Sequence, residues 1–408
     1  MENVWEWDNG RVGLGIYISV PFCRTKCSYC NFASDVFSRA RFEAYVDRVS
    51  MDIARAPQIA ARMGGQIERQ VDSIYLGGGT PTVVERGQLQ RMFGAVRTQF
   101  EVQANAEITV ECAPGTLAPA MLDELLNCGV NRVSLGVQSF VDAESAAVGR
   151  LHKRAGVLDD IARLRAGGIM NINLDLIAGL PHQTAESWTI SVNETLAAGA
   201  PHVSVYMLEV DDDSRLGREL IAGGTRYHAH FVPDEEAVAD FYVTACETLE
   251  AAGVAQYEIS NFARAGFESR HNLKYWTRHP YLGFGVDAHS MLLSTEPGAV
   301  AVRFANPDAL EEYIGGLLPE CTIVSRATSL EETFFLGLRL NRGVNLRDVA
   351  EKFGREAVQG AEGAIGELVE LGLLEPAGEF IRLTPRGRLL SNEVFQAFLA
   401  PAGISDQP

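Results

Sequence analysis

The sequence predicts an α/β protein: a parallel sheet curved into a partial (β/α)6 barrel of the TIM type, followed by a smaller, mainly helical, winged-helix-like domain. Three observations support this prediction. Six short β-like runs alternate with helical stretches, polar residues recur where these runs end, and the pattern changes after about residue 290. With 408 residues, of which 47% are hydrophobic and 22% charged, the chain has room for one large domain and a second unit.

The six β-like runs are short and rich in branched or apolar residues. They are Ile16–Val20, Ser73–Leu76, Glu107–Glu111, Arg132–Leu135, Asn173–Ile177 and His202–Met207. Between them, Arg41–Ile53 and Ala185–Leu196 carry apolar residues near helical spacing, as the crossover helices between parallel strands do. Since a complete barrel of this type has eight βα units, six units predict a barrel that stays open.

The C-terminal part is expected to form the winged-helix-like unit. Three helices, a hairpin and a last helix are predicted, in that order, at Ser329–Leu340, Leu346–Phe353, Ala357–Leu371, Leu373–Leu383 and Gly387–Leu399. We therefore divide the chain into a barrel at 1–290, a connector at 291–325 and a helical domain at 326–408. Because the formal net charge is −18, packing or partner docking is favoured over DNA reading for this domain.

Three cysteines, Cys23, Cys27 and Cys30, follow the first predicted strand with the spacing C-x3-C-x2-C. Three thiolates can hold three irons of a [4Fe-4S] cluster and leave the fourth iron open for a small ligand. Structural zinc is the alternative, but no second C-x2-C pair and no H-x3-H pair follows. A disulfide is less favoured, since seven cysteines are an odd number and no signal peptide is evident.

Other polar residues stand at strand ends, which a parallel barrel brings to one rim where ligands bind. They are Gly78, Gly79, Thr80, Glu111, Gln138 and Asp175. The glycine-rich turn lacks the lysine of a P-loop, so a nucleoside triphosphate site is not predicted. Glu111 is suited to an ammonium group, Arg150 to a carboxylate and Asp175 to ribose hydroxyls, a combination that fits S-adenosylmethionine.

A second group of residues places an imidazole and aromatic rings close together, as a porphyrin site requires. It comprises His271, Asn272, Tyr275 and Trp276. From these residues alone, structural packing of His271 is favoured over heme ligation, and the same holds for His152 and His289.

The charge of −18 argues against a large nucleic-acid footprint, so small molecules or proteins are the expected partners. Arg264, Arg270, Lys274 and Arg278 lie close together in sequence, which we interpret as a solvated loop. No stretch approaches the roughly 20 apolar residues of a membrane span. We therefore expect no transmembrane segment and a cytoplasmic location; a homodimer is left open.

Taken together, these motifs resemble the radical S-adenosylmethionine superfamily. The resemblance rests on the cysteine run, on Gly77–Pro81, and on the segments Val133–Phe140 and Leu174–Pro181. More narrowly, nearly the whole chain is similar to relatives of oxygen-independent coproporphyrinogen III oxidase. The resemblance implies a radical S-adenosylmethionine barrel in which Cys23, Cys27 and Cys30 bind the [4Fe-4S] cluster.

The resemblance also implies a cofactor pocket for S-adenosylmethionine. Tyr17 would lie near the methionyl group and Tyr29 beside the adenine. The other residues carried over to this pocket are Gly78, Gly79, Thr80, Glu111, Gln138, Arg150 and Asp175. No separate catalytic residue is assigned.

Two branches of this family differ in function. The oxidase has a fourth cysteine two positions after the third and a longer N-terminal extension, whereas this chain has Phe32 there and 22 residues before Cys23. The other branch comprises heme chaperones with a His-Asn-x-x-Tyr-Trp motif, which His271–Trp276 reproduces. The expectation is a chaperone that binds heme and delivers it to acceptor hemoproteins.

The alternative is the oxidase itself, which decarboxylates propionate side chains in porphyrin biosynthesis by radical chemistry. Whether the protein is an enzyme stays open at this point. Radical modification of RNA is disfavoured by the acidic charge and by the lack of an RNA-binding appendage.

Overall fold

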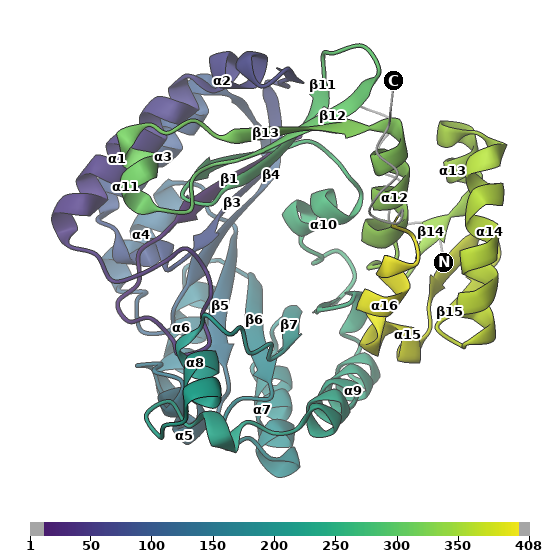
Figure 1. Cartoon of the computed structure of the whole chain (residues 1–408). Coiled ribbons are helices and arrows are strands. Elements are labelled where there is room, and N and C mark those ends of the chain that lie inside the picture. Colours follow the sequence, from purple (N-terminus) through teal and green to yellow (C-terminus); the bar gives the residue numbers. More distant parts are fainter. Residues whose placement is uncertain (1–11, 400–408) are drawn as a thin grey trace.

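The computed structural model describes residues 12–399, which form a curved sheet with helices on its outer face and a helical unit at one side (Figure 1). Six parallel strands lie side by side in chain order: β1 (Leu14–Val20), β3 (Gln70–Gly78), β4 (Glu101–Cys112), β5 (Arg132–Gln138), β6 (Asn171–Ala178) and β7 (His202–Met207). All six predicted strands are thereby confirmed. Their branched residues fill a core between the sheet and the outer helices.

The sheet has further strands that the sequence analysis did not predict. β10 (Tyr281–Gly285) pairs with β1 in parallel, and β11 (His289–Ser294), β12 (Ala299–Ala305) and β13 (Glu320–Ser325) follow in antiparallel order. β2 (Gly65–Gln66) joins β11, and β9 (Asn261–Ala263) and β8 (Ala255–Glu258) extend the opposite edge. Within residues 12–399, β13 and β8 end the sheet without pairing to each other, so the barrel is open as predicted.

The segment 291–325, expected to be a connector, is mostly part of this sheet and also carries helix α11 (Leu310–Gly315). Within this segment the backbone of β12 completes its hydrogen bonds with β11 and β13 rather than with solvent. The domain boundaries near 290 and 325 stay a proposal, and parts of the first and last predicted domains lie outside the described residues.

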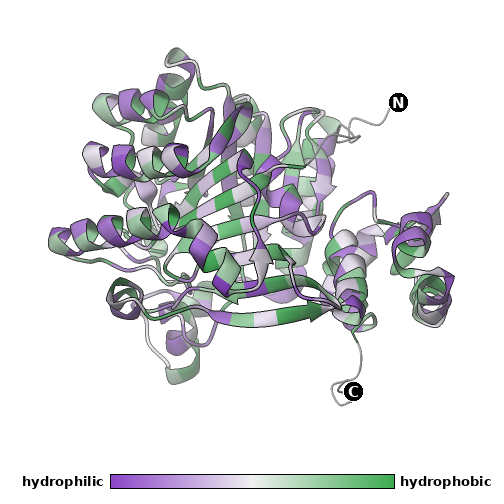
Figure 2. Cartoon of the chain, turned by 90° about the horizontal axis from the view of Figure 1, so that it is seen from above, coloured by the Kyte–Doolittle hydropathy of each residue, from purple (hydrophilic) through white to green (hydrophobic). Residues whose placement is uncertain are grey.

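Helices between the parallel strands cover the outer face of the sheet. They are α1 (Arg39–Ala54), α2 (Ala56–Arg62), α3 (Arg86–Gln99), α4 (Pro119–Asn127), α5 (Asp142–Ala147), α6 (Arg154–Ala166), α7 (Ala185–Ala197) and α9 (Glu235–Ala251), with the short 3-10 turn η1 (Pro81–Val83). In α1, Tyr45, Val46, Val49 and Ile53 are buried at helical spacing. Figure 2 shows hydrophobic residues concentrated on the strands and hydrophilic residues on the outward helix faces.

Helix α10 (Arg270–Trp276) lies on the inner side of the curved sheet instead (Figure 1). Its first turn is capped by Ser269 and by the buried carboxylate of Glu107, which accepts the backbone N–H groups of Arg270 and His271 at 3.0 Å each. The carboxylate of Glu107, on β4, therefore stabilises the N-terminal end of α10 inside the barrel.

The prediction that the basic residues around α10 form a solvated loop is wrong for Lys274 and Arg278, whereas Arg264 is exposed. Lys274 is buried, and its Nζ lies 2.7 Å from Oδ1 of the buried Asp72. Arg278 follows α10 and lies with its Nε 2.9 Å from Oε2 of the buried Glu332. These two cations are therefore neutralised inside the molecule by carboxylates far away in sequence, which sequence spacing alone does not show.

The C-terminal unit has the predicted winged-helix-like order. It contains α12 (Arg326–Gly337), β14 (Val344–Asn345), α13 (Leu346–Phe353), α14 (Arg355–Glu370), β15 (Leu374–Ala377) and β16 (Phe380–Leu383), with the small sheet in the order β14-β16-β15. The predicted last helix is divided into α15 (Pro385–Leu389) and α16 (Ser391–Gln396), because Leu390 leaves helical geometry at ψ 33°. The unit has a hydrophobic core of its own.

Side-chain contacts with the sheet and with helix α10 fix the C-terminal unit to the barrel. Glu332 of α12 also pairs with Arg303 of β12 at 2.6 Å, and the guanidinium of Arg339 lies 4.3 Å from the centre of the Trp276 ring. Ile259, from the turn after β8, packs into the C-terminal core. No helix in the described part of the chain is long and apolar enough to cross a membrane.

Candidate cofactor site

A cavity of about 310 Å³ opens at the carboxyl ends of the parallel strands. Its lining includes most of the predicted site residues, namely Cys23, Cys27, Tyr29, Cys30, Gly78, Gly79, Thr80, Glu111, Gln138, Arg150, Asp175 and Asn272. The register of the parallel strands accounts for this convergence, because strand ends reach the same rim of the barrel. Tyr17, His271, Tyr275 and Trp276 do not line this cavity.

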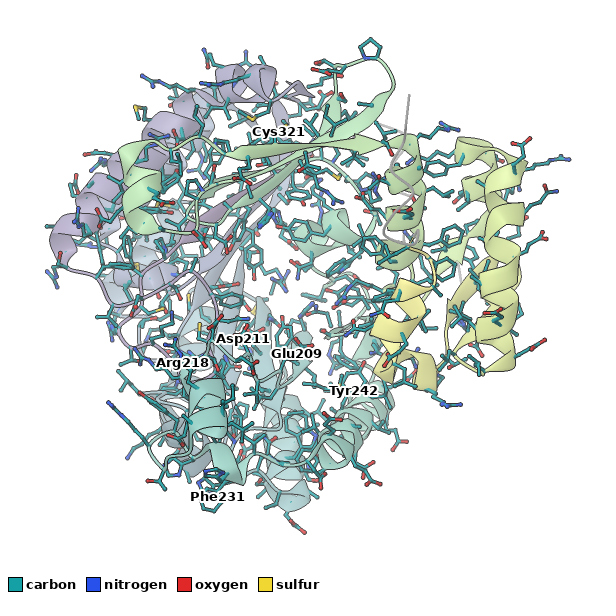
Figure 3. All side chains as sticks on the ribbon, in the orientation of Figure 1. Glu209, Asp211, Arg218, Phe231, Tyr242 and Cys321 are labelled. Carbon is teal, nitrogen blue, oxygen red and sulfur yellow. The ribbon has the colours of Figure 1, made fainter. Side chains whose placement is uncertain are left out.

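The cysteine loop follows β1 and is held from two sides. The N–H of Ser28 donates to the carbonyl of Val148 at 3.2 Å, and the carbonyl of Ser28 accepts the N–H of Leu216 at 2.8 Å. Leu216 belongs to helix α8 (Arg215–Ala222), which lies beside the loop, with Asp211 and Arg218 labelled in Figure 3. The backbone around the thiols is therefore fixed by residues more than a hundred positions away.

The three thiols are free and half-buried. Burial raises the pKa of Cys23, although contacts with Ser34 and Thr80 oppose this shift. In residues 12–399, no group of three or more histidine, cysteine or acidic side chains is arranged around a single metal position. Three thiols that line one cavity suit a [4Fe-4S] cluster, since each sulfur can bind a different iron.

The glycine turn after β3 packs directly on this loop. The N–H of Gly79 donates to the carbonyl of Val20 at 2.8 Å and the N–H of Thr80 to that of Phe22 at 2.7 Å, while the N–H of Gly78 donates to Glu111 at 3.2 Å. These three amides are thus bonded within the protein, while Gly78, Gly79 and Thr80 still line the cavity. A Cβ on residue 79 would lie 2.7 Å from the carbonyl oxygen of Phe22, so glycine is required for this close packing.

Two carboxylates face each other across the cavity. Burial, together with repulsion from Asp175, raises the pKa of Glu111 to about 7, and hydrogen bonds from Tyr75 and Gly78 only partly oppose this. Burial also raises the pKa of Asp175, whose carboxylate accepts hydrogen bonds from Ser134 at 2.9 Å and Asn173 at 2.7 Å. A cationic ligand between them would relieve this repulsion, and S-adenosylmethionine carries two cationic groups.

Three buried polar atoms of residues that line the cavity have no hydrogen-bond partner within residues 12–399: Nε of Arg132, Oε1 of Gln138 and Nε of Arg150. Gln138 has a φ of 67°, a left-handed conformation that non-glycine residues rarely adopt, and this is typical of functional sites. The Nη2 of Arg150 donates to the hydroxyl of Tyr29 at 3.0 Å. An acceptor and a donor left without partners in the same cavity fit a ligand with both amino and carboxylate groups.

Some polar residues of this cavity were missed by the sequence analysis. Arg132, Asn173, Ser204 and Asn261 line it from the strands. Asn173 donates to the hydroxyls of Ser204 and of the neighbouring Ser134, and Ser204 donates to Asn261. These residues could have been found from the sequence, because polar residues recur at alternate positions of β5 and β6. Alternate side chains of a barrel strand point to its interior. Arg132 is the first residue of β5, and at a strand end the sequence is equally consistent with a loop residue.

His271 is fully buried on α10. Its Nδ1 lies 3.0 Å from the hydroxyl of Ser73, and its Nε2 lies 2.9 Å from the hydroxyl of Tyr275. Burial, with further contributions from Lys274 and Arg132, lowers the pKa of His271 to about 3, so the imidazole is neutral. Both ring nitrogens lie within hydrogen-bonding distance of side-chain hydroxyls, which is the structural packing that the residues alone favoured.

A second cavity, of about 320 Å³, adjoins the first. Tyr17 and Tyr275 line it, together with Tyr281, Asp287 and His289. Four residues line both cavities, namely Phe32, Ser34, Gly78 and Glu111. Tyr17, predicted beside the methionyl group of the cofactor, thus lies on the side of Glu111 that faces the second cavity.

The comparisons with known proteins agree with this geometry. Residues 17–193 match the model of the radical SAM superfamily, and residues 324–390 match the HemN C-terminal domain. The chain is 35% identical over 391 residues to the heme chaperone HemW of Bacillus subtilis, covering 94% of this chain and 98% of that protein. It is 30% identical to the heme chaperone HemW of Escherichia coli, covering 95% and 98%.

Among solved structures, the coproporphyrinogen III oxidase HemN of Escherichia coli matches with a TM-score of 0.80 and 23% identity, covering 95% of this chain and 90% of that chain. This likeness shows that the barrel and the C-terminal unit share one fold with that enzyme. The full-length sequence similarity is the more specific finding. The chain belongs to the radical SAM superfamily and, within it, to the family of HemW heme chaperones.

Proposed function

We propose that this protein is a heme chaperone: it binds heme next to a [4Fe-4S] and S-adenosylmethionine site and passes it to acceptor hemoproteins. The observation that carries the proposal is the full-length similarity to HemW proteins, together with a cavity that retains the predicted cofactor residues. The cytoplasm is the proposed location, because all seven cysteines are free, as expected in a reducing compartment.

Cys23, Cys27 and Cys30 would hold the cluster, whose open iron supplies a coordination position and an electron. Glu111 and Asp175 would receive the cationic groups of S-adenosylmethionine, and Arg150 its carboxylate. Tyr29, which packs with Val148, Ile177 and Leu180, offers an apolar surface for the adenine. The free donor and acceptor atoms of the cavity support this assignment.

The His271–Trp276 segment borders both cavities without exposing its histidine. Asn272 lines the first cavity and Tyr275 the second. We propose that the motif positions these two side chains for cofactor and heme, with His271 orienting the hydroxyl of Tyr275. The motif would then contribute to heme binding through position rather than through coordination.

Oxidative decarboxylation of coproporphyrinogen III is the second candidate, supported by the HemN fold. Against it stands Phe32, which occupies the place of the oxidase's fourth cysteine and lies, 63% exposed, at the rim shared by the two cavities. A phenyl ring cannot coordinate a cluster iron, but it can contact a flat apolar ligand.

Anaerobic titration of hemin into the cluster-loaded full chain tests the proposal, with the Soret band as readout. Saturable binding of one heme per chain, followed by transfer of that heme to an apo-hemoprotein, is expected. In parallel, the protein is incubated with coproporphyrinogen III, S-adenosylmethionine and a reductant. Turnover to protoporphyrinogen IX would identify an oxidase, and absence of specific heme binding would contradict the chaperone function.

A further inference from the structure

Arg132 differs from two other cations that are buried in the barrel. The cations of Lys274 and Arg278 have carboxylate partners, at 2.7 Å in Asp72 and at 2.9 Å in Glu332. Arg132 is only 1% exposed, but within residues 12–399 its guanidinium forms neither a hydrogen bond nor an ion pair. Arginine stays charged in proteins, and a buried charge without a partner is strongly destabilising. The position is therefore suited to an anion that comes from outside the chain.

Two carboxylates share the cavity with Arg132 but do not pair with it. Burial raises the pKa of Glu111 and of Asp175, and the charge of Arg132 opposes this rise in both. Each carboxylate nevertheless takes its hydrogen bonds from other groups: Glu111 from Tyr75 at 2.8 Å, and Asp175 from Ser134 at 2.9 Å. Arg132 thus lies within electrostatic reach of both acids while its N–H donors stay available to a ligand.

Arg132 lies at the inner end of the first cavity. It is the first residue of β5, and Gln138, which also lines this cavity, is the last. A strand of this length spans about 20 Å, so the cavity reaches from the rim with the cysteine loop into the barrel. The inner wall also includes Asn173 and Ser204, whose side chains are hydrogen-bonded to each other at 3.0 Å. Their polar groups satisfy one another, in contrast to the guanidinium.

The ligand that fills this position must bring a carboxylate of its own. The carboxylate of S-adenosylmethionine is proposed to bind Arg150, which donates to Tyr29 of the cysteine loop at 3.0 Å. Heme, the other proposed ligand, is a flat apolar ring system that carries propionate carboxylates. Asn272 of the His271–Trp276 segment lines the same cavity as Arg132, so both face one space. The planar fork of a guanidinium binds a carboxylate with two parallel hydrogen bonds.

We propose that Arg132 receives a propionate carboxylate of bound heme at the inner end of the cofactor cavity. The inference rests on the proposed heme-chaperone function and adds the side chain that recognises the acid groups of the cargo. It follows that the protein distinguishes heme from tetrapyrroles whose propionates are blocked.

The test compares hemin with hemin dimethyl ester, in which the propionates are neutral. Each is titrated anaerobically into the cluster-loaded full chain, with the Soret band as readout. The variants are Arg132→Gln, which removes the charge, and Arg132→Lys, which keeps a charge but not the planar fork. Arg165→Gln is the matched control, because Arg165 lies on the outer helix α6, donates to the carbonyls of Ala198 and Gly199, and lines neither cavity.

The wild type is expected to bind hemin more tightly than the ester. Arg132→Gln should weaken hemin binding by roughly 10- to 100-fold, the range of a hydrogen bond to a charged group, and leave binding of the ester nearly unchanged. Arg132→Lys should fall between the two, and Arg165→Gln should keep the wild-type preference for hemin.

A purely structural role of Arg132 predicts different results. If its charge only offsets Glu111 and Asp175, Arg132→Gln would lower the thermal unfolding temperature of the ligand-free protein and weaken binding of both ligands alike. We expect the unfolding temperature not to fall, because the substitution removes an unpaired buried cation. Calorimetric titration should also show no loss of affinity for S-adenosylmethionine. Such a loss, with the preference for hemin intact, would overturn the proposal and assign Arg132 to the carboxylate of that cofactor.

Equal affinities of the wild type for hemin and its ester, or an unchanged preference in Arg132→Gln, would likewise overturn the assignment while leaving heme binding intact. A wild-type protein without saturable hemin binding would instead contradict the proposed function itself. The two failures are therefore distinguishable in one series of titrations.

Discussion

The missing side chain at Gly79 determines how closely the turn after β3 can approach the cysteine loop. The N–H groups of Gly79 and Thr80 donate to the carbonyls of Val20 and Phe22, just before Cys23. The position of the thiols therefore depends on this turn. The sequence showed three glycines and suggested that they serve a ligand. Their use for packing against another chain segment became visible only when β1 and β3 were paired.

Gly79→Ala is therefore expected to displace the cysteine loop and lower cluster occupancy, because the new methyl group would lie 2.7 Å from the carbonyl oxygen of Phe22. The measurement is iron and sulfide content after anaerobic reconstitution. Gly87→Ala, in α3, is the matched control, since its methyl group would meet no atom within 4 Å. Full occupancy in Gly79→Ala would show that the loop is not held by this turn.

Glu111 couples ligand binding to pH. Its pKa of about 7 means that the carboxylate is fully ionised only above neutral pH, and an ammonium group binds the ionised form. We expect the affinity for S-adenosylmethionine to rise between about pH 6 and about pH 8, by at most about tenfold per pH unit. In Glu111→Gln the affinity should be lower and nearly flat over this range, as measured by calorimetric titration.

The same group gives an opposite trend in the ligand-free protein. Between the ordinary carboxyl pKa of 4.5 and about 7, the unfolded chain loses its proton before the folded chain does, so this residue lowers folding stability as pH rises. Glu111→Gln should remove that part of the pH dependence in thermal unfolding. An unchanged profile would show that Asp175 or another group dominates.

At the scale of elements, the inner helix α10 shows what sequence patterns could not reveal. The six strands β1 and β3 to β7 were predictable from their branched residues, and α13 from its helical spacing. The position of α10 inside the barrel depends on Glu107, Asp72 and Ser73, which approach it from β3 and β4, about two hundred residues earlier. The burial of His271 follows from these partners rather than from its neighbours in sequence.

The buried pair of Lys274 and Asp72 makes a prediction for this helix. Lys274→Met leaves the Asp72 carboxylate buried without its cation, which costs about 3–5 kcal/mol of folding free energy. The double variant Lys274→Met and Asp72→Asn should recover a large part of this loss. Denaturant unfolding measures both. Equal losses in the single and double variants would mean that the pair is not isolated from other charges.

At the scale of the whole molecule, the winged-helix-like unit is a fixed part of the structure. The carboxylate of Glu332 forms ion pairs with Arg278, which follows α10, and with Arg303 of β12. One side chain of α12 is thus bonded to both the inner-helix segment and the sheet. The presence and order of this unit were predictable from local patterns. Its attachment was not, because each of these charged residues looks like a surface residue in its own segment.

Glu332→Ala should therefore loosen this unit from the barrel by removing the partner of two cations, one of them largely buried. Faster amide hydrogen exchange in α12 to α14 than in β1 to β7 is the expected readout. Glu375→Ala, which removes an exposed pair with Arg382, is the control and should change stability by about 1 kcal/mol or less. Uniform exchange across both units would show that they unfold together.

The pairing of β1 with β10 also bears on how the protein is made. β1 leaves the ribosome long before its parallel partner on one side, which ends at Gly285. During synthesis the strand that leads into the cysteine loop therefore has an open edge until β10 has emerged, and such long-range pairing is slow. Iron and sulfide would accordingly enter after translation has passed β10 rather than as the cysteines appear.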